Sequence, residues 1–180
     1  VESVQGAILV MVSHGLSTGA LFFIIGMLYE RRHTRQISDF GGLARVAPMM
    51  TLAFVITAFS SIGLPGLNGF VGEFLVLIGS FGRYPVLVGV ATTVVVFSAA
   101  YMLWATQRVF FNRFTNPANE GIGDLNLREI AVLAPLIAAW AIQRVCAARV
   151  SIEGGLQFLR QRAQRIEMPV AGIARVRVWR

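Results

Sequence analysis

One carboxyl group lies inside an otherwise uncharged apolar stretch, and it is the clearest candidate for chemistry. Glu73 is the only acidic residue within any of the apolar blocks of the sequence. A carboxyl at membrane depth is costly, and a small change in nearby charge is enough to make it take up or release a proton. The position therefore suggests proton transfer. The structural alternative is a carboxyl paired to a neighbouring helix.

A histidine and two hydroxyls form a second candidate. Ser17 and Thr18 follow His14 by three and four residues, so all three share one face of a helix. Histidine titrates near neutrality, and hydroxyls can hold water or pass a proton, so the trio predicts one station of a proton path. The alternative is a neutral histidine that is hydrogen-bonded between helices.

The element that positions Glu73 is expected to be a broken helix. The apolar block 48–81 would be about 51 Å long as one straight helix, against a hydrocarbon layer of roughly 30 Å. Pro65 removes a backbone donor and Gly66 permits non-helical dihedral angles, so we place the break at 63–69. Unpaired backbone groups survive at membrane depth only where protein or water satisfies them, as along an ion pathway.

Glycines are spaced so that Glu73 would be approachable. Gly66, Gly69 and Glu73 recur at intervals of three and four, which predicts one face on which another helix or a water-filled seam can come close.

The other elements are expected to be membrane-spanning helices. The uncharged blocks 7–28 and 85–106 each hold enough residues for a helix of about 33 Å, which spans a bilayer. The run 130–142 is too short to span unaided and is interpreted as a partial span. The predicted fold class is an all-helical, multi-span membrane bundle with one discontinuous helix.

Composition agrees with this interpretation and excludes other classes. Of the residues 56% are hydrophobic and 14% charged, which argues against a water-soluble fold. All 16 basic residues are arginine, and the net charge is +7; in a membrane chain such arginines indicate topology more than nucleic-acid binding. The lone Cys146 offers neither an internal disulfide nor a metal or redox framework.

Charge placement predicts the orientation. The loops 31–45 and 108–128 are rich in arginine and follow alternate spans, so both are expected on the cytoplasmic side. The N-terminal end of the first helix then faces the opposite compartment. The first residues do not resemble a signal peptide, and the chain is interpreted as beginning mid-protein.

The order of several motifs resembles a known family. They are Ser13-His14-Gly15-Leu16-Ser17, Tyr29-Glu30-Arg31-Arg32-His33-Thr34-Arg35, Phe40-Gly41-Gly42-Leu43 and Leu64-Pro65-Gly66-Leu67-Asn68-Gly69-Phe70-Val71-Gly72-Glu73-Phe74. Together they are similar to the later helices of an antiporter-like subunit of respiratory complex I, NADH:quinone oxidoreductase, nearest the subunit M or chain 4 type. The resemblance covers roughly residues 4–135.

The resemblance implies a fragment of a larger proton-translocating subunit, with residues 1–136 as its antiporter-like transmembrane part. His14 matches the axial histidine of the helix before the last broken one, and Glu73 matches the glutamate of that broken helix, near the exit side. The family's axial lysines lie upstream, and this sequence has no lysine, so the chain is not expected to pump alone.

The resemblance also implies cofactors and partners outside this chain. NADH, FMN, iron–sulfur clusters and quinone would bind other subunits, and this chain would bind no cofactor or metal. The expected partners are other membrane subunits of the complex, including two homologous antiporter-like subunits, together with the lipid bilayer and no nucleic acid. The expected location is the bacterial inner (plasma) membrane.

The tail 137–180 departs from the family pattern. Half of all the arginines lie in 143–180. One hypothesis is a frame change in the source gene. The other is a basic amphipathic surface helix, because Leu156, Leu159, Ala163 and Ile166 recur at three and four.

Other functions remain open at this point. A cation/proton antiporter subunit of the Mrp type, or a subunit of a membrane-bound hydrogenase, would share the same helical domain. The loop 30–35 favours the complex I member. A third possibility is a truncated product with no independent activity.

Overall fold

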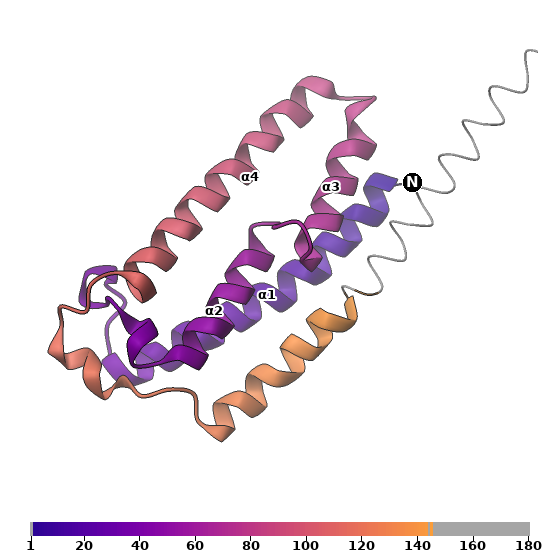
Figure 1. Ribbon diagram of the computed structural model, residues 1–180. Helices are drawn as coiled ribbons and strands as arrows, with labels where there is room; N and C mark the ends of the chain where they lie inside the picture. The colour runs from indigo at the N-terminus through magenta and orange to yellow at the C-terminus, as the bar shows by residue number, and fades with distance from the viewer. Residues whose placement is uncertain (1, 144, 146–180) are drawn as a thin grey trace, which may run out of the picture.

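The computed structural model describes residues 2–143 and 145, and these residues fold entirely as helices and loops (Figure 1). The all-helical prediction is therefore confirmed for this part of the chain. The two hypotheses about the arginine-rich tail concern residues that lie mostly outside it. The long helices are α1 (Glu2–Arg32), α2 (Pro48–Ser61), α3 (Asn68–Phe81) and α4 (Pro85–Thr106), with a further helix at 127–143.

Two of the helices are long and apolar enough to cross a bilayer. These segments are Ser3–Arg32, with 30 residues, and Pro85–Phe111, with 27 residues. The second joins α4 to a single π-helical turn, η3 (Gln107–Phe111). Both segments exceed the roughly 20 residues that a spanning helix needs.

The segment between these spans consists of two half-length helices in tandem. Helices α2 and α3 have 14 residues each, about 21 Å apiece and too short to span singly. The intervening residues 62–67 are not helical. Beyond this gap α3 continues away from the loop end of the molecule, and α1 runs beside both halves (Figure 1).

Glycines bring α1 and α3 into backbone contact. A side-chain carbon added to Gly6 would lie 2.8 Å from the carbonyl oxygen of Gly72, and one added to Gly72 would lie 2.9 Å from the backbone nitrogen of Val10. A side-chain carbon added to Gly79 would lie 2.8 Å from the backbone nitrogen of Ser3. Small residues allow this close approach, which is typical of packed helices in membranes.

The two arginine-rich loops lie at the same end of the molecule and pack on each other. The Asp39 carbonyl, in η1 (Ile37–Asp39), accepts hydrogen bonds from the side-chain nitrogens of Asn116, at 3.0 Å, and Asn119, at 3.2 Å. A further short helical turn, η2 (Leu43–Arg45), precedes α2, and η4 (Pro117–Ile122) contains Asn119. The relative placement expected from the charge pattern is therefore present in the structure.

Asp124 caps the start of α2. Its carboxylate oxygens accept hydrogen bonds from the backbone N–H groups of Met49, at 2.8 Å, and Met50, at 2.9 Å. Partial burial alone would raise the pKa of Asp124, but these two N–H groups, that of Leu125 and the nearby Arg31 outweigh it and hold the pKa below its usual value.

Arg31 joins α1 to the helix at 127–143. Its guanidinium forms an ion pair with Glu129 at 2.8 Å and donates to the Asp124 carbonyl at 3.2 Å. Glu129 also accepts from the Asn126 N–H while its own N–H donates to the Asn126 side chain. This reciprocal capping box starts the helix at 127–143 and fixes its direction.

The hydrophobic core lies between α1, α2 and the two loops. Its members are buried apolar side chains from these elements and from the helix at 127–143: Ala20, Leu21, Ile24, Met27, Leu28, Leu43, Ala47, Met50, Phe54, Ala58, Phe110, Ile122 and Leu133. Helix α4 contributes no residue to this core and buries only Thr106. The core therefore fixes the loop end of α1 and α2, from which the polar residues of the site extend.

Candidate functional site: a polar cavity at the helix break

The break between α2 and α3 depends on two glycines with positive φ. Gly63 has φ +69° and Gly66 has φ +95°, a region that glycine occupies without steric cost. The N–H of Ile62 still donates to the Ala58 carbonyl, at 3.1 Å, and that of Leu64 to the Phe59 carbonyl, at 3.2 Å. The chain thus ends α2 with satisfied backbone groups, turns, and restarts as α3.

Glu73 lies one turn into α3 and points back toward the break. It is half-buried, and a side-chain carbon on Gly63 would lie 2.9 Å from its carboxyl carbon. The absence of a side chain at Gly63 therefore makes the space that the Glu73 carboxylate occupies. Likewise, a side-chain carbon on Gly69 would overlap the Ser60 carbonyl oxygen.

Helix α1 presents a row of polar side chains to this region. Ser13 and Ser17 are buried, and His14 lies between them on the helix and is more exposed. The Ser17 hydroxyl donates to the His14 carbonyl at 3.4 Å, and the Thr18 hydroxyl lies 3.4 Å from the His14 ring nitrogens. The histidine and its two hydroxyl neighbours are thus in contact.

These groups from three helices line one small polar cavity of about 30 Å³. This is room for roughly one or two water molecules with polar partners. Its walls are Val10, Ser13, His14, Ser17, Ser60, Ser61, Gly69 and Glu73. His14 and Glu73, which are 59 positions apart in sequence, therefore face the same space.

One hydroxyl in this wall has unused hydrogen-bonding capacity. The Ser61 oxygen is buried and has no hydrogen-bond partner within the part of the chain that the structure describes. A buried polar atom without a partner is costly unless water satisfies it. The orphan hydroxyl is consistent with a cavity that holds water.

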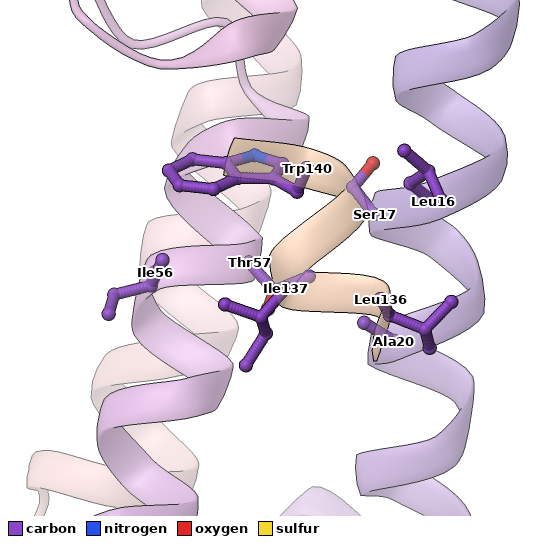
Figure 2. A pocket seen from close by; sticks show the side chains of 8 residues that line it. All are labelled: Leu16, Ser17, Ala20, Ile56, Thr57, Leu136, Ile137 and Trp140. Carbon is purple, nitrogen blue, oxygen red and sulfur yellow. The ribbon is translucent and has the colours of Figure 1, made fainter. Parts of the chain in front are cut away.

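A second, apolar cavity lies beside the polar one. It measures about 10 Å³ and shares Ser17 with its neighbour. Figure 2 shows its walls: Leu16, Ser17 and Ala20 from α1, Ile56 and Thr57 from α2, and Leu136, Ile137 and Trp140 from the helix at 127–143. This volume is at the lower limit for a single water, and its apolar walls border the polar cavity at Ser17.

No grouping of three or more metal-ligating side chains occurs among residues 2–143 and 145. The chemistry that the arrangement offers is proton uptake and release by a carboxyl and an imidazole that line the same polar cavity.

Comparison with known proteins assigns the chain to a family. A model of the NADH:quinone oxidoreductase/Mrp antiporter transmembrane family matches residues 1–119. The chain belongs to this family. It is an integral membrane protein, as the two apolar spans also indicate.

Curated relatives agree with the family assignment. NADH-quinone oxidoreductase subunit M of Mycobacterium tuberculosis (strain ATCC 25618 / H37Rv) is 48% identical over 137 residues, which cover 74% of this chain and 24% of the relative. The subunit M of Rhodobacter capsulatus is 44% identical over 76% of this chain and 27% of its own length. NADH-ubiquinone oxidoreductase chain 4 of Marchantia polymorpha is 37% identical, with coverages of 76% and 28%.

The chain spans about a quarter of the length of the curated relatives that it matches, 24% to 28% in these three cases. The resemblance found from the sequence motifs, to antiporter-like subunits of the M or chain 4 type, is confirmed by these matches.

The residues predicted from sequence divide between the cavity wall and its surroundings. In this member of the antiporter family, Glu73, His14, Ser17 and Gly69 line the cavity. Thr18 lies behind His14 and contacts its ring. The roles of these residues in proton transfer stay predictions.

The prediction that Gly66 shares the Glu73 face of a helix is wrong. Gly66 precedes α3 and lies in the turn, with φ +95° and open space around it. Pro65 lies in the same turn and is exposed. The residues that allow close approach to α1 are Gly72 and Gly79 instead.

Sequence reasoning missed four polar residues near the cavity: Ser60, Asn68, Trp140 and Gln143. Ser60, Asn68 and Gln143 are buried, and all four are joined by hydrogen bonds. The available signal was weak: Ser60 and Asn68 flank the break, while Trp140 and Gln143 belong to the segment that departs from the family pattern.

Proposed function

We propose that this chain forms part of a proton translocation pathway in the membrane arm of a proton-pumping NADH:quinone oxidoreductase. The observation that carries the proposal is the polar cavity at the helix break, which both Glu73 and His14 line. The names of the relatives, all subunits of NADH oxidoreductases that reduce quinones, support the coupling to electron transport.

Glu73 is the proposed proton carrier. Its carboxyl is the single acidic group of the cavity wall, and it lies in the space left by the missing side chain of Gly63. A carboxyl that alternates between charged and neutral forms next to water can take a proton from one side and release it to the other.

His14 is the proposed second station. Its ring reaches the cavity from α1, with Thr18 in contact behind it and the buried Ser17 one turn along the helix. In the proposed pathway a proton passes between the imidazole of His14 and the carboxyl of Glu73 through the cavity that both side chains line.

The electron chemistry is proposed to take place in other subunits. NADH, FMN, iron–sulfur clusters and quinone would bind there, and this chain would act on protons alone. The proposed partners are other membrane subunits of the complex, including two homologous antiporter-like subunits, and the proposed location is the bacterial inner membrane. The exposed apolar surface of α4 supports contact with lipid or with such neighbours.

A cation/proton antiporter of the Mrp type is less well supported. The family description covers both classes, but the relatives named above are NADH oxidoreductase subunits. The same names give no support to a hydrogenase subunit.

An experiment on isolated membranes separates these functions. The protein that contains this chain would be tagged, and inside-out vesicles would be assayed for proton uptake with NADH, with and without sodium. The proposal predicts that NADH:quinone activity copurifies with the tag and that proton uptake follows NADH oxidation without a need for sodium. Sodium-dependent exchange in the absence of NADH would support the Mrp type instead. If neither activity is detected, the chain is a truncated product with no independent activity.

A further inference from the structure

A network of buried and half-buried hydrogen bonds links all the helices that meet at the break. The Trp140 indole N–H donates to the Ser60 hydroxyl at 2.7 Å, and that hydroxyl donates to the side-chain oxygen of Asn68. The Asn68 amide nitrogen donates to the Gln143 side-chain oxygen at 2.9 Å, and the Gln143 amide nitrogen donates to the Leu9 carbonyl at 3.0 Å. The network runs from the helix at 127–143 through α2 and α3, back to 127–143, and ends on α1.

The two ends of this hydrogen-bond network determine the direction of every bond in it. An indole N–H can only donate and a backbone carbonyl can only accept. Because Trp140 donates at one end and Leu9 accepts at the other, Ser60, Asn68 and Gln143 each accept from one side and donate to the other. The orientations of both amides therefore follow from the network itself, and no member has a mismatched partner.

This network of hydrogen bonds does not store protons. Indole, hydroxyl and carboxamide groups do not change charge near neutral pH, so a proton cannot be stored on any of its side chains. Its five groups come from segments up to 134 positions apart in sequence. What the hydrogen-bond network can do is hold these segments in one arrangement.

The segments that it holds are those that shape the space for Glu73. Ser60 is three residues before Gly63, against which the Glu73 carboxylate lies, and Asn68 precedes Gly69, which contacts the Ser60 carbonyl. A shift of α2 relative to α3 at the Ser60–Asn68 bond would move Gly63 relative to Glu73. The position of the carboxylate in the cavity is thus linked to the hydrogen bonds next to it.

We propose that Trp140 and Gln143 are positioning residues for Glu73: through Ser60 and Asn68 they hold the two halves of the broken helix so that the Glu73 carboxylate faces the polar cavity. Figure 2 shows Trp140 on the α2 side of the apolar cavity, above Ile137 in this view. The effect of this positioning on proton transfer rests on the proposed proton-carrier function of Glu73. The positioning itself concerns only the geometry of the helix break.

The test measures the surroundings of Glu73 directly. Dicyclohexylcarbodiimide reacts with carboxylic acids in apolar surroundings, and mass spectrometry of the peptide that contains Glu73 gives the rate of labelling in the intact membrane complex. Trp140→Phe keeps an aromatic ring but removes the N–H donor together with one ring of the indole, whereas Gln143→Met keeps the side-chain length and removes the donor and the acceptor. We expect either variant to change the labelling rate of Glu73 by roughly two- to tenfold, the equilibrium effect of one buried hydrogen bond.

Two matched controls lie far from the network. Trp104→Phe and Gln107→Met change exposed residues near the end of α4, and both are expected to label at the wild-type rate. Glu73→Gln is expected to remove the label from this peptide, which identifies the reacting group.

The outcomes separate this proposal from the proposed function. If Trp140→Phe and Gln143→Met lower the thermal stability of the complex but leave the Glu73 labelling rate at the wild-type value, the residues are merely structural and the positioning role is wrong. If labelling changes as expected while Glu73→Gln pumps protons normally, the positioning role stands and the proton-carrier role of Glu73 is lost.

Discussion

At the scale of single residues, the account depends on how closely Glu73 lies against Gly63. We predict that Gly63→Ala impairs the protein more than Gly66→Ala. Both glycines have positive φ, so each alanine costs about 1 kcal/mol of backbone strain. Only Gly63 has the Glu73 carboxyl within reach of the new methyl group, whereas the space around Gly66 is open. Thermal unfolding of the two variant complexes in detergent measures the difference, and equal losses of stability would contradict the close contact.

His14 offers a second test at this scale. His14→Gln keeps a polar group beside Thr18 but removes the imidazole, the group that can both accept and donate a proton. We predict fewer protons translocated per NADH oxidised, with NADH oxidation itself less affected. His33→Gln, an exposed histidine beyond the end of α1, serves as the control. A normal proton-to-electron ratio in His14→Gln would assign His14 a structural role.

At the scale of elements, the start of α2 depends on a charged cap. Asp124→Asn is predicted to lose about 1 kcal/mol of stability, because asparagine has no charge and only one oxygen to accept from the Met49 and Met50 N–H groups. The pKa of Asp124 is held below its usual value in the folded protein. Its contribution is therefore fully present above the ordinary aspartate pKa of about 4 and is lost as the pH falls through the lower pKa of the folded state.

Thermal unfolding as a function of pH checks this prediction. The wild type should lose its advantage over Asp124→Asn as the pH falls below the ordinary aspartate range, while Glu120→Gln, which changes an exposed carboxyl, should behave like the wild type. An advantage that persisted unchanged at the lowest pH would mean that the charge of Asp124 does not stabilise α2.

Local chemistry explains which elements were predictable from the sequence. Pro65 and the neighbouring glycines indicate a break because proline and glycine restrict or free the backbone wherever they occur. His14 and Glu73 stand out because a titratable residue in an apolar block is rare. By contrast, the bonds of Gln143 to Asn68 and Leu9 join residues 75 and 134 positions apart, and no local pattern encodes which distant amide will meet which. Gly66 was misplaced for a related reason, since helical spacing has no meaning until the start of α3 is known.

At the scale of the whole molecule, the two arginine-rich loops lie together at one end, and the charge rule predicts that this end is cytoplasmic. Single cysteines would be introduced by Ser38→Cys, Thr115→Cys and Gly82→Cys in a background carrying Cys146→Ser. All three positions are exposed in loops or turns. A membrane-impermeant maleimide is expected to label the first two from the cytoplasmic side and the third from the opposite side. Labelling of Ser38→Cys and Gly82→Cys from the same side would contradict the topology.

The exposed surface of α4 also belongs to this scale. Large apolar side chains such as Val86, Val94 and Phe97 are more than 60% exposed, and α4 lies apart from α1 and α2 over most of its length (Figure 1). In a membrane such a surface meets lipid or other helices. The polar cavity, by contrast, is lined by side chains of α1, α2 and α3, which all belong to this part of the family fold.

The measurement that tests the central claim most directly is the number of protons moved per electron pair in vesicles that contain the Glu73→Gln complex. Glutamine keeps the size and hydrogen-bonding of the side chain but cannot carry a proton. The account predicts that this ratio falls well below that of the wild type and of Glu120→Gln while quinone reduction by NADH continues. A ratio equal to that of the wild type would show that protons do not pass through Glu73, and the proposed pathway would be wrong.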